Sequence, residues 1–342
     1  MKNNNKRRKN KRKNDAKFLY LLVLLFFTAI MLTTTTYAWF TSNRIVTINT
    51  INIHVETAGG VEVSADGANW KAIITPEDLT TVHSTTYPRS VNQLPDVMEP
   101  VSTGKEIDSS TGFMKMYYGV TTNNEDGYYI LTSSRINEQE GNGPDNDGKF
   151  VSFDLFFKVS NDTQIYMTNN SQVSYLNDTR KGIAAATRIA FVDEGTAPVG
   201  ATIAEIQSLR GGTSGSTYIW EPNYDVHTAA AVANARDVYG INTQQSGATR
   251  IAYDGVINEI PESAGILLKN AKSSNYPNYF RPVNVDYPTR EGFTEYQPVF
   301  TLRGGITKMR IYMWIEGQDV DCENNASYDD ITFDLQLTIN PA

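Results

Sequence analysis

The sequence predicts a mainly β protein, an antiparallel β-sandwich with loop and short-helix insertions, for which a jelly roll is the favoured form. Three observations support this fold class. Gly, Thr, Asn, Ser and Tyr are plentiful, with 24 Gly and 19 Tyr, whereas long runs of Leu, Ala, Glu and Lys are absent. Many short segments alternate apolar and polar residues, and turn residues separate them at short spacing. No tandem repeat interrupts this pattern.

Charge is distributed unevenly along the chain. Nine Lys or Arg and one Asp give residues 1–17 a charge of +8, and residues 18–38 carry none. Since the total is −8, the remaining residues carry −8 − 8 = −16. A basic start directly before an apolar run is typical of a signal peptide or a positive-inside anchor. The acidic body disfavours polyanions, so nucleic acid is not an expected partner.

The apolar run 18–32 leaves two interpretations open. Its fifteen residues are long for a signal peptide and short for a spanning helix, yet no charge follows before Arg44, so an uncut chain could cross a bilayer. Ala38 at −1 and Thr36 at −3 favour cleavage between Ala38 and Trp39. Residues 1–38 are therefore predicted to be a signal peptide or membrane anchor, and residues 39–342 a single extracellular domain.

The first strand is expected at residues 45–55, directly after this junction. Ile, Val and Thr dominate it, which favours β structure. One phase of its period-two pattern is predicted to form the mostly apolar face: Ile45, Thr47, Asn49, Ile51, Ile53 and Val55.

Turn and cap signals place the next elements. Asp66–Gly67 predicts a hairpin between two short strands. Thr75 and Pro76 predict the N-cap and first residue of one helical turn. Residues 82–112, rich in Pro, Ser, Thr and Gly, are expected to form a long surface excursion.

Later segments predict core strands and one insertion. Residues 150–157 show the clearest core strand, and Arg310, Tyr312 and Trp314 alternate cleanly within another. The C-terminal strand, near 331–339, must pair with strands already formed, so early and late strands are expected to share a sheet. Residues 196–265 have helical spacing and Gly stops, and are predicted to be an insertion of short helices and loops.

Motifs for catalysis are missing from the sequence. The chain has three His, and none lies in an H-E-x-x-H pattern. Cys322 is the single cysteine, so no intrachain disulfide can form, which suits a Gram-positive cell surface. There is no G-x-S-x-G and no phosphate-binding glycine loop. We therefore expect no enzyme and no cofactor.

One acidic segment is a candidate cation site. Loop carboxylates are the ligands that Ca²⁺ prefers, and extracellular Ca²⁺ is plentiful. The segment around residue 320 supplies three of them, Asp319, Asp321 and Glu323. The competing interpretation is a solvated hairpin loop without a metal.

The stretch "TYAWFTSN" after the apolar run, followed by an Ile/Val/Thr-rich strand, resembles the TasA and camelysin family of Gram-positive surface proteins. The match covers roughly residues 33–52. The resemblance implies a jelly roll, extracellular matrix fibres, and donation of the N-terminal strand to the next subunit, with Trp39 and Phe40 as anchors at the end of that strand. Two features depart from the family pattern: no acidic residue follows the aromatics, and residues 196–265 look inserted. No metal motif supports the peptidase activity sometimes attached to camelysin.

Two functional hypotheses follow. In the first, the chain is an exported structural subunit of a surface fibre or biofilm matrix, which self-associates by donating the strand 45–55. In the second, it is a membrane-anchored extracellular binding ectodomain, an adhesin or a glycan-binding module, in which that strand belongs to its own domain and Trp39 and Phe40 lie in the membrane interface.

Overall fold

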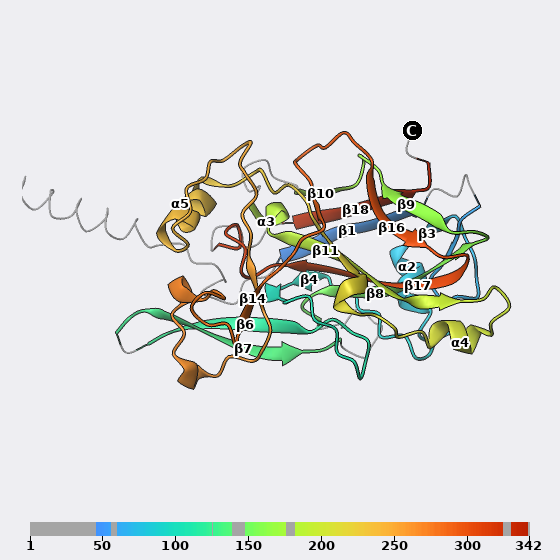
Figure 1. The fold of residues 1–342 in the computed structure, drawn as a ribbon, viewed down its shortest axis with the longest axis horizontal. Coiled ribbons are helices and arrows are strands. Elements are labelled where there is room, and N and C mark those ends of the chain that lie inside the picture. Colours follow the sequence, from blue (N-terminus) through green and yellow to red (C-terminus); the bar gives the residue numbers. More distant parts are fainter. Residues whose placement is uncertain are drawn as a thin grey trace, which may run out of the picture. The chain divides into compact units, whose positions relative to one another are not determined.

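The computed structural model describes residues 46–55, 60–124, 126–138, 148–175, 182–323 and 330–340. The predicted apolar run and cleavage site (Ala38, Trp39) and the first residue of the predicted strand, Ile45, lie outside the described residues. Within the described ranges, no helix is both long and apolar enough to cross a membrane. The described part is mainly β, as the sequence predicts (Figure 1).

The first sheet contains the N-terminal and C-terminal strands. Its path is β16 (Gln297–Leu302), β9 (Thr163–Met167), β18 (Asp330–Thr338), β1 (Val46–Val55) and β3 (Ile73–Ile74). Two more strands pair off this path: β10 (Gln172–Tyr175) with β18, and β4 (Val97–Met98) with β1. The expectation that early and late strands share a sheet is confirmed, but β1 and β18 run parallel rather than antiparallel.

The second sheet has six strands. Their order is β15 (Tyr287–Pro288), β12 (Thr217–Glu221), β11 (Thr187–Ala197), β17 (Gly305–Ile315), β8 (Val151–Val159) and β2 (Glu62–Ser64). Strand β12 lies inside the segment 196–265, so that segment is not the purely helical and looped insertion that the sequence suggests; it contributes a strand to a main sheet.

Smaller elements surround these sheets. Two further sheets join β5 (Val101–Ser102), β6 (Met116–Asn123) and β7 (Tyr129–Ile136), and β13 (Asp254–Val256) with β14 (Phe280–Pro282). The helices are α2 (Pro76–Thr81), α3 (Gly182–Ala185), α4 (Ile203–Gln207) and α5 (Ala229–Asp237), with 3-10 turns at Ser214–Ser216, Glu262–Ala264 and Leu268–Asn270. Thr75 caps α2, as predicted, and Asp78 completes the capping box.

One hydrophobic core is shared by the two main sheets. It draws Ile53 and Phe333 from the first sheet and Phe153 and Ile311 from the second. Phe300 of β16 marks the contact, because its ring centroid lies 6.0 Å from that of Phe157 and 5.6 Å from that of Phe191, both on the second sheet. Apolar burial on facing strands thus holds the two sheets together.

Strand β17 is buried on both faces. Every residue from Gly305 to Ile315 is buried. Met309, Ile311, Met313 and Ile315 join the core between the sheets, as does Ile306, whereas Tyr312 and Trp314 join a second cluster on the opposite face. Residues 82–112, expected at the surface, help to cover that face: Gln93 and Val101 are fully buried. Full burial explains why both faces of the strand are apolar over residues 312–315, where Tyr312 and Trp314 stand at the positions that a half-exposed strand would give to polar residues.

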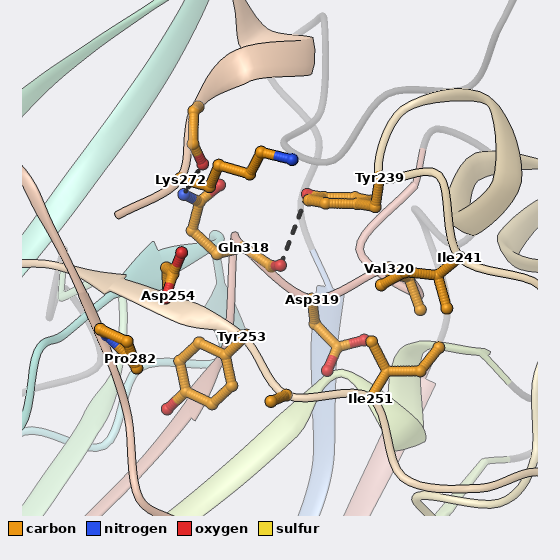
Figure 2. Close-up of a pocket in the computed structure, with 12 residues that line it drawn as sticks. Tyr239, Ile241, Ile251, Tyr253, Asp254, Lys272, Pro282, Gln318, Asp319 and Val320 are labelled. Atoms are coloured by element: carbon orange, nitrogen blue, oxygen red, sulfur yellow. Dashed lines mark hydrogen bonds between the residues drawn. The ribbon is translucent and has the colours of Figure 1, made fainter. Parts of the chain in front are cut away.

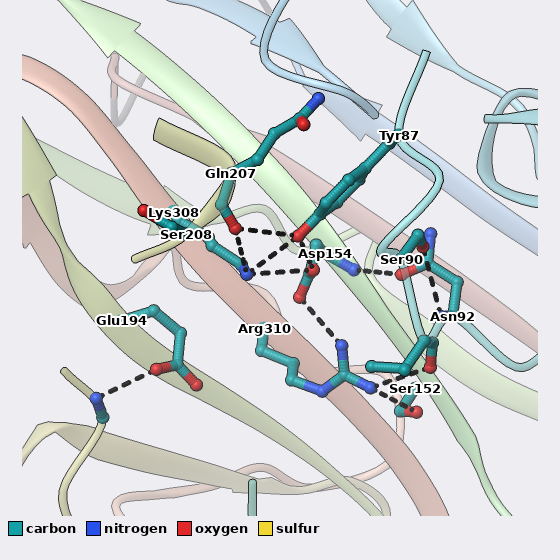
Figure 3. A network of polar contacts seen from close by, with 12 residues as sticks. Tyr87, Ser90, Asn92, Ser152, Asp154, Glu194, Gln207, Ser208, Lys308 and Arg310 are labelled. Atoms are coloured by element: carbon teal, nitrogen blue, oxygen red, sulfur yellow. Dashed lines mark hydrogen bonds and ion pairs between the residues drawn. The ribbon is translucent and has the colours of Figure 1, made fainter. Parts of the chain in front are cut away.

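A buried polar network joins this covering layer to the second sheet (Figure 3). Arg310 Nη1 donates to Asp154 Oδ1 at 2.9 Å, and Lys308 Nζ lies 3.2 Å from Asp154 Oδ2. The Tyr87 hydroxyl donates to Asp154 Oδ2 at 2.9 Å. Lys308 also donates to the carbonyl of Gln207 at the end of α4. The two cations keep the pKa of Asp154 at about 2 although burial raises it, so the carboxylate stays charged.

We expect Arg310→Met to lower the free energy of unfolding by about 3 kcal/mol, because Asp154 would keep only one of its two cations, Lys308, and Glu138 would lose its ion pair. The carbonyl of Val91 and the hydroxyl of Ser152 would also lose their donor. Chemical denaturation measures this loss. Arg303→Met, at an exposed position, is the matched control and should change stability by less than about 0.5 kcal/mol. Equal stability of the two variants would contradict the network's role.

Candidate functional site

Strand β1, the predicted assembly strand, lies in the first sheet of its own chain. It pairs with β18 in parallel register, from Thr47 opposite Asp330 to Val55 opposite Leu337. Ile51, Ile53 and Val55 are buried in the shared core.

A register shift in β1 corrects the predicted apolar face. The ladder with β18 is irregular between Ile48 and Thr50. Before the shift, Val46 is buried and Ile48 partly buried, while Thr47 is exposed. After it, the buried residues are the odd-numbered ones. A β-bulge inserts one extra residue, so side chains change faces there. The predicted single apolar phase is therefore wrong at Thr47 and correct at Ile51, Ile53 and Val55.

The other edge of β1 is held only near its two ends. Val46 and Thr47 pair with β4, and Ile53 and His54 pair with β3. Ile48 adds one backbone hydrogen bond to the carbonyl of Asp96, at 2.8 Å. Between these ends, residues 49–52 have no strand partner on this side within the described ranges. β1 thus pairs with β18 along one edge, and on its other edge it pairs only near its two ends, with the short strands β4 and β3.

The acidic segment 316–323 is buried, so the interpretation of a solvated loop is wrong. Glu316 and Glu323 are fully buried, and Asp321 and Asp319 are 1% and 7% exposed. Arg188 Nη2 donates to Asp319 Oδ2 at 2.5 Å and to Glu221 Oε1 at 2.7 Å.

Asp321 and Glu323 are bonded to the segment that precedes α5. Asp321 Oδ2 lies 2.7 Å from His227 Nδ1, and the Thr228 hydroxyl donates to Glu323 Oε1 at 3.3 Å. Salt bridges or hydrogen bonds therefore engage each of the three predicted calcium ligands, and Asp321 Oδ1 is left as a buried oxygen without a hydrogen-bond partner in the described part of the chain. In the described part of the chain, no three His, Cys, Asp or Glu side chains are grouped so as to hold a metal ion. The structure gives the calcium prediction no support.

The histidines and the cysteine do not form a nucleophile–base pair where the structure describes them. His54 lies exposed on β1, and His83 Nδ1 contacts the carbonyl of Ser90 at 3.1 Å. His227 is bonded to Asp321, and Cys322 is fully buried. A substrate therefore has no access to the cysteine.

A pocket of about 190 Å³ opens beside the acidic segment (Figure 2). Asp319 and two neighbours from the turn after β17 form one side of it. The segments after α5, before β13, after the third 3-10 turn, and in β14 complete it: Tyr239, Ile241, Ile251, Ala252, Tyr253, Asp254, Ala271, Lys272, Pro282, Gln318, Asp319 and Val320.

Sequence analysis singled out only one of these residues, Asp319. The others follow no spacing motif, because five separate segments bring them together. The helical spacing and Gly stops in 196–265 were the one available signal that this region differs from the strands around it.

No protein-family model, curated protein or solved structure matches this chain.

Burial of Glu316 raises its pKa to about 7, although Ser102, Trp314 and the amide of Gln318 donate to the carboxylate and Arg188 lies nearby. A raised carboxyl pKa stabilises the fold below the unfolded value of about 4.5, and this contribution is lost as pH rises through about 7. Glu316 should therefore make the protein more stable at pH 5 than at pH 8, by up to about 3 kcal/mol.

Glu316→Gln should remove this part of the pH dependence, which denaturation between pH 5 and pH 8 measures. Burial also raises the pKa values of Glu194 and Asp321 to about 7, so these groups titrate in the same interval in every variant, and the change relative to the unsubstituted protein reports on Glu316. Glu262→Gln, at an exposed position, is the control. An unchanged difference between pH 5 and pH 8 in Glu316→Gln would contradict the assignment.

Proposed function

We propose that the chain is an exported cell-surface protein whose β-sandwich, of the jelly-roll kind, is the subunit of an extracellular fibre, and that subunits join by exchanging β1. The observation that carries the proposal is the position of β1 in its sheet. This strand fills a groove between the long strand β18 on one side and the short strands β3 and β4 on the other. An identical strand from another copy would fit the same groove.

Chain order supports exchange. β1 is the first strand that the structure describes, and all other strands of both sheets follow it in the chain. It can therefore leave the groove without any other segment passing through the sheet. Four residues, 56–59, join it to the described part that begins at Gly60, so the connection spans at most about 18 Å when extended. Exchange of an identical terminal element is a low-cost route to assembly.

Removing β1 from the groove would destabilise the domain unless another strand took its place. Four apolar side chains of β1 are buried: Val46, Ile51, Ile53 and Val55. At about 1.5–3 kcal/mol each, they contribute roughly 6–12 kcal/mol, which is comparable to the whole stability of a typical domain. An empty groove would therefore be unstable. Exchange is favourable only when the strand of another copy replaces β1, above all while the exported chain is still folding.

Export is supported by the sequence alone. The basic residues 1–17, the apolar run 18–32 and the acidic remainder are arranged as in secreted or anchored proteins. The chain is accordingly proposed to lie at the cell surface or in its matrix.

The second candidate is an anchored extracellular binding ectodomain. One observation favours it: β1 completes the sheet of its own chain, with eight residue pairs to β18. If residues 1–38 remain attached, β1 is tethered near the membrane, and the domain acts as a single copy that binds ligands through its loops and pockets.

Cysteine pairs distinguish the two candidates. His54 and Gln336 are neighbours across β1 and β18, and His54 is exposed. In a Cys322→Ala background, one preparation carries His54→Cys and another carries Gln336→Cys. We expect mild oxidation of the mixture, after joint refolding, to give disulfide-linked pairs of copies, seen by non-reducing electrophoresis and mass spectrometry.

The control replaces Gln336→Cys by Thr301→Cys, an exposed residue on β16 that does not neighbour β1. This mixture should give few linked pairs. If the His54 and Gln336 mixture stays unlinked while the double variant closes within one copy, β1 keeps to its own sheet and the ectodomain is the better account.

The N-terminal residue of protein recovered from the cell surface gives a second test. We expect mass spectrometry to find Trp39 at the terminus, because release from residues 1–38 frees β1 for exchange. An intact residue 1 or 2 would tether the strand and count against fibre assembly.

A further inference from the structure

The pocket beside the acidic segment is built from parts of the chain that the fibre proposal leaves without a role. Figure 2 shows Tyr239, Tyr253, Asp254, Lys272 and Asp319 around it. Apart from the turn after β17, its walls come from residues 239–282, outside the two main sheets.

The walls combine apolar surface with two aromatic rings. Ile241, Ile251 and Val320 supply aliphatic surface, and Tyr239 and Tyr253 supply the rings. The hydroxyl of Tyr239 donates to the carbonyl of Gln318 at 3.4 Å, a long hydrogen bond that a ligand hydroxyl could replace. Such a wall suits a ligand that has an apolar face.

Two side chains of opposite charge keep unused bonding capacity. Asp254 Oδ2 accepts from the amide of Ser273 at 2.6 Å, and its other oxygen has no bond to the described residues. Lys272 has no ion pair with any residue in the described ranges. A carboxylate acceptor and an ammonium donor therefore both line the hollow without bonding each other.

Asp319, the other acidic side chain of the pocket, is held in place by its hydrogen-bond partners. Both oxygens of Asp319 are engaged, one by Arg188 Nη2 at 2.5 Å and one by the amide of Asp321 at 2.9 Å. The guanidinium of Arg188 also lies 5.1 Å from the ring centroid of Tyr253. Arg188, itself fully buried, thus holds one carboxylate and one ring of the pocket in place, which lowers the ordering cost of binding.

Size restricts the ligand. The pocket has a volume of about 190 Å³, which suits a ligand of one six-membered ring better than a ligand of several rings. Drug-sized ligands generally need about 300 Å³ or more. An oligosaccharide could place only a terminal ring inside.

We propose that this pocket binds a single neutral sugar ring, free or at the end of a glycan. Sugar hydroxyls both donate and accept, so neighbouring hydroxyls can bond Asp254 and Lys272 together, while the C–H face of the ring packs on a tyrosine. The carboxylates of Asp254 and Asp319 would repel a small anion, and the ammonium of Lys272 would repel an organic cation. A pure hydrocarbon would leave Asp254 and Lys272 desolvated without partners.

The test is isothermal titration of the full chain, kept in a detergent without a sugar headgroup. The probes are glucose, galactose, rhamnose and N-acetylglucosamine, each to 20 mM, with leucine and ethanolamine as zwitterionic and cationic comparison ligands. We expect at least one sugar to bind with a millimolar dissociation constant, and neither comparison ligand to compete. Lys272→Met and Asp254→Asn should each weaken binding about tenfold or more, since each removes a charged hydrogen-bond partner.

The matched controls make the same two substitutions, Lys to Met and Asp to Asn, at residues that do not line the pocket. Lys269→Met lies on the 3-10 turn Leu268–Asn270, three residues before Lys272, and the ammonium of Lys269 lies over the ring of Tyr128. Asp237→Asn lies on α5, paired with Arg236. Both should leave sugar binding within about twofold, and thermal unfolding verifies that all variants are folded.

Three results would overturn the proposal. The first is that no sugar gives a heat of binding up to 20 mM. The second is that Lys272→Met and Asp254→Asn both leave sugar binding unchanged. The third is that leucine or ethanolamine binds more tightly than the sugars. None of these outcomes depends on whether β1 is exchanged, because no residue of the pocket lies on β1 or β18.

Discussion

The burial of both faces of β17 is the constraint on which the rest of the structure depends. One face needs the first sheet, which supplies β1, β18 and β16 to the shared core. The other face carries Lys308 and Arg310, and Glu316 follows directly after the strand; these buried charged groups need partners. Asp154, Tyr87 and Gln207, the last residue of α4, provide partners for Lys308 and Arg310, as Figure 3 shows. The covering layer is therefore a requirement of the charges on this strand as much as of its apolar residues.

Much of the fold follows from sequence patterns, and the exceptions have physical reasons. The Thr75 cap and the pairing of early with late strands depend on local chemistry or on simple topology, so they were predictable. The prediction that residues 82–112 form a surface excursion was wrong because several of their polar side chains are buried. Asn92 and Gln93, for example, form hydrogen bonds with the backbone in and next to β8, and these bonds replace the hydrogen bonds that the side chains would make with water. Composition alone does not distinguish polar groups that face water from polar groups that face a buried strand.

The candidate site was less predictable than the fold. Asp319, Asp321 and Glu323 stand out in the sequence as a carboxylate group, but their roles depend on Arg188 and His227, which lie more than ninety residues away. Likewise, the phase of β1 changes at a bulge that only its pairing with β18 imposes. Long-range partners decide both outcomes, and a single sequence without pairing information does not specify them.

The parallel alignment of β1 and β18 has a mechanical consequence. The chain enters the pair at Val46 and leaves it at Thr338, at opposite ends of two parallel strands. A pull between the two chain ends would therefore slide one strand along the other, so that the whole ladder of backbone bonds carries the load at once. An antiparallel pair pulled at adjacent ends would open one bond at a time. A surface protein tethered through its N-terminal side, or linked to the next copy through β1, would resist flow and shear by this geometry without any disulfide.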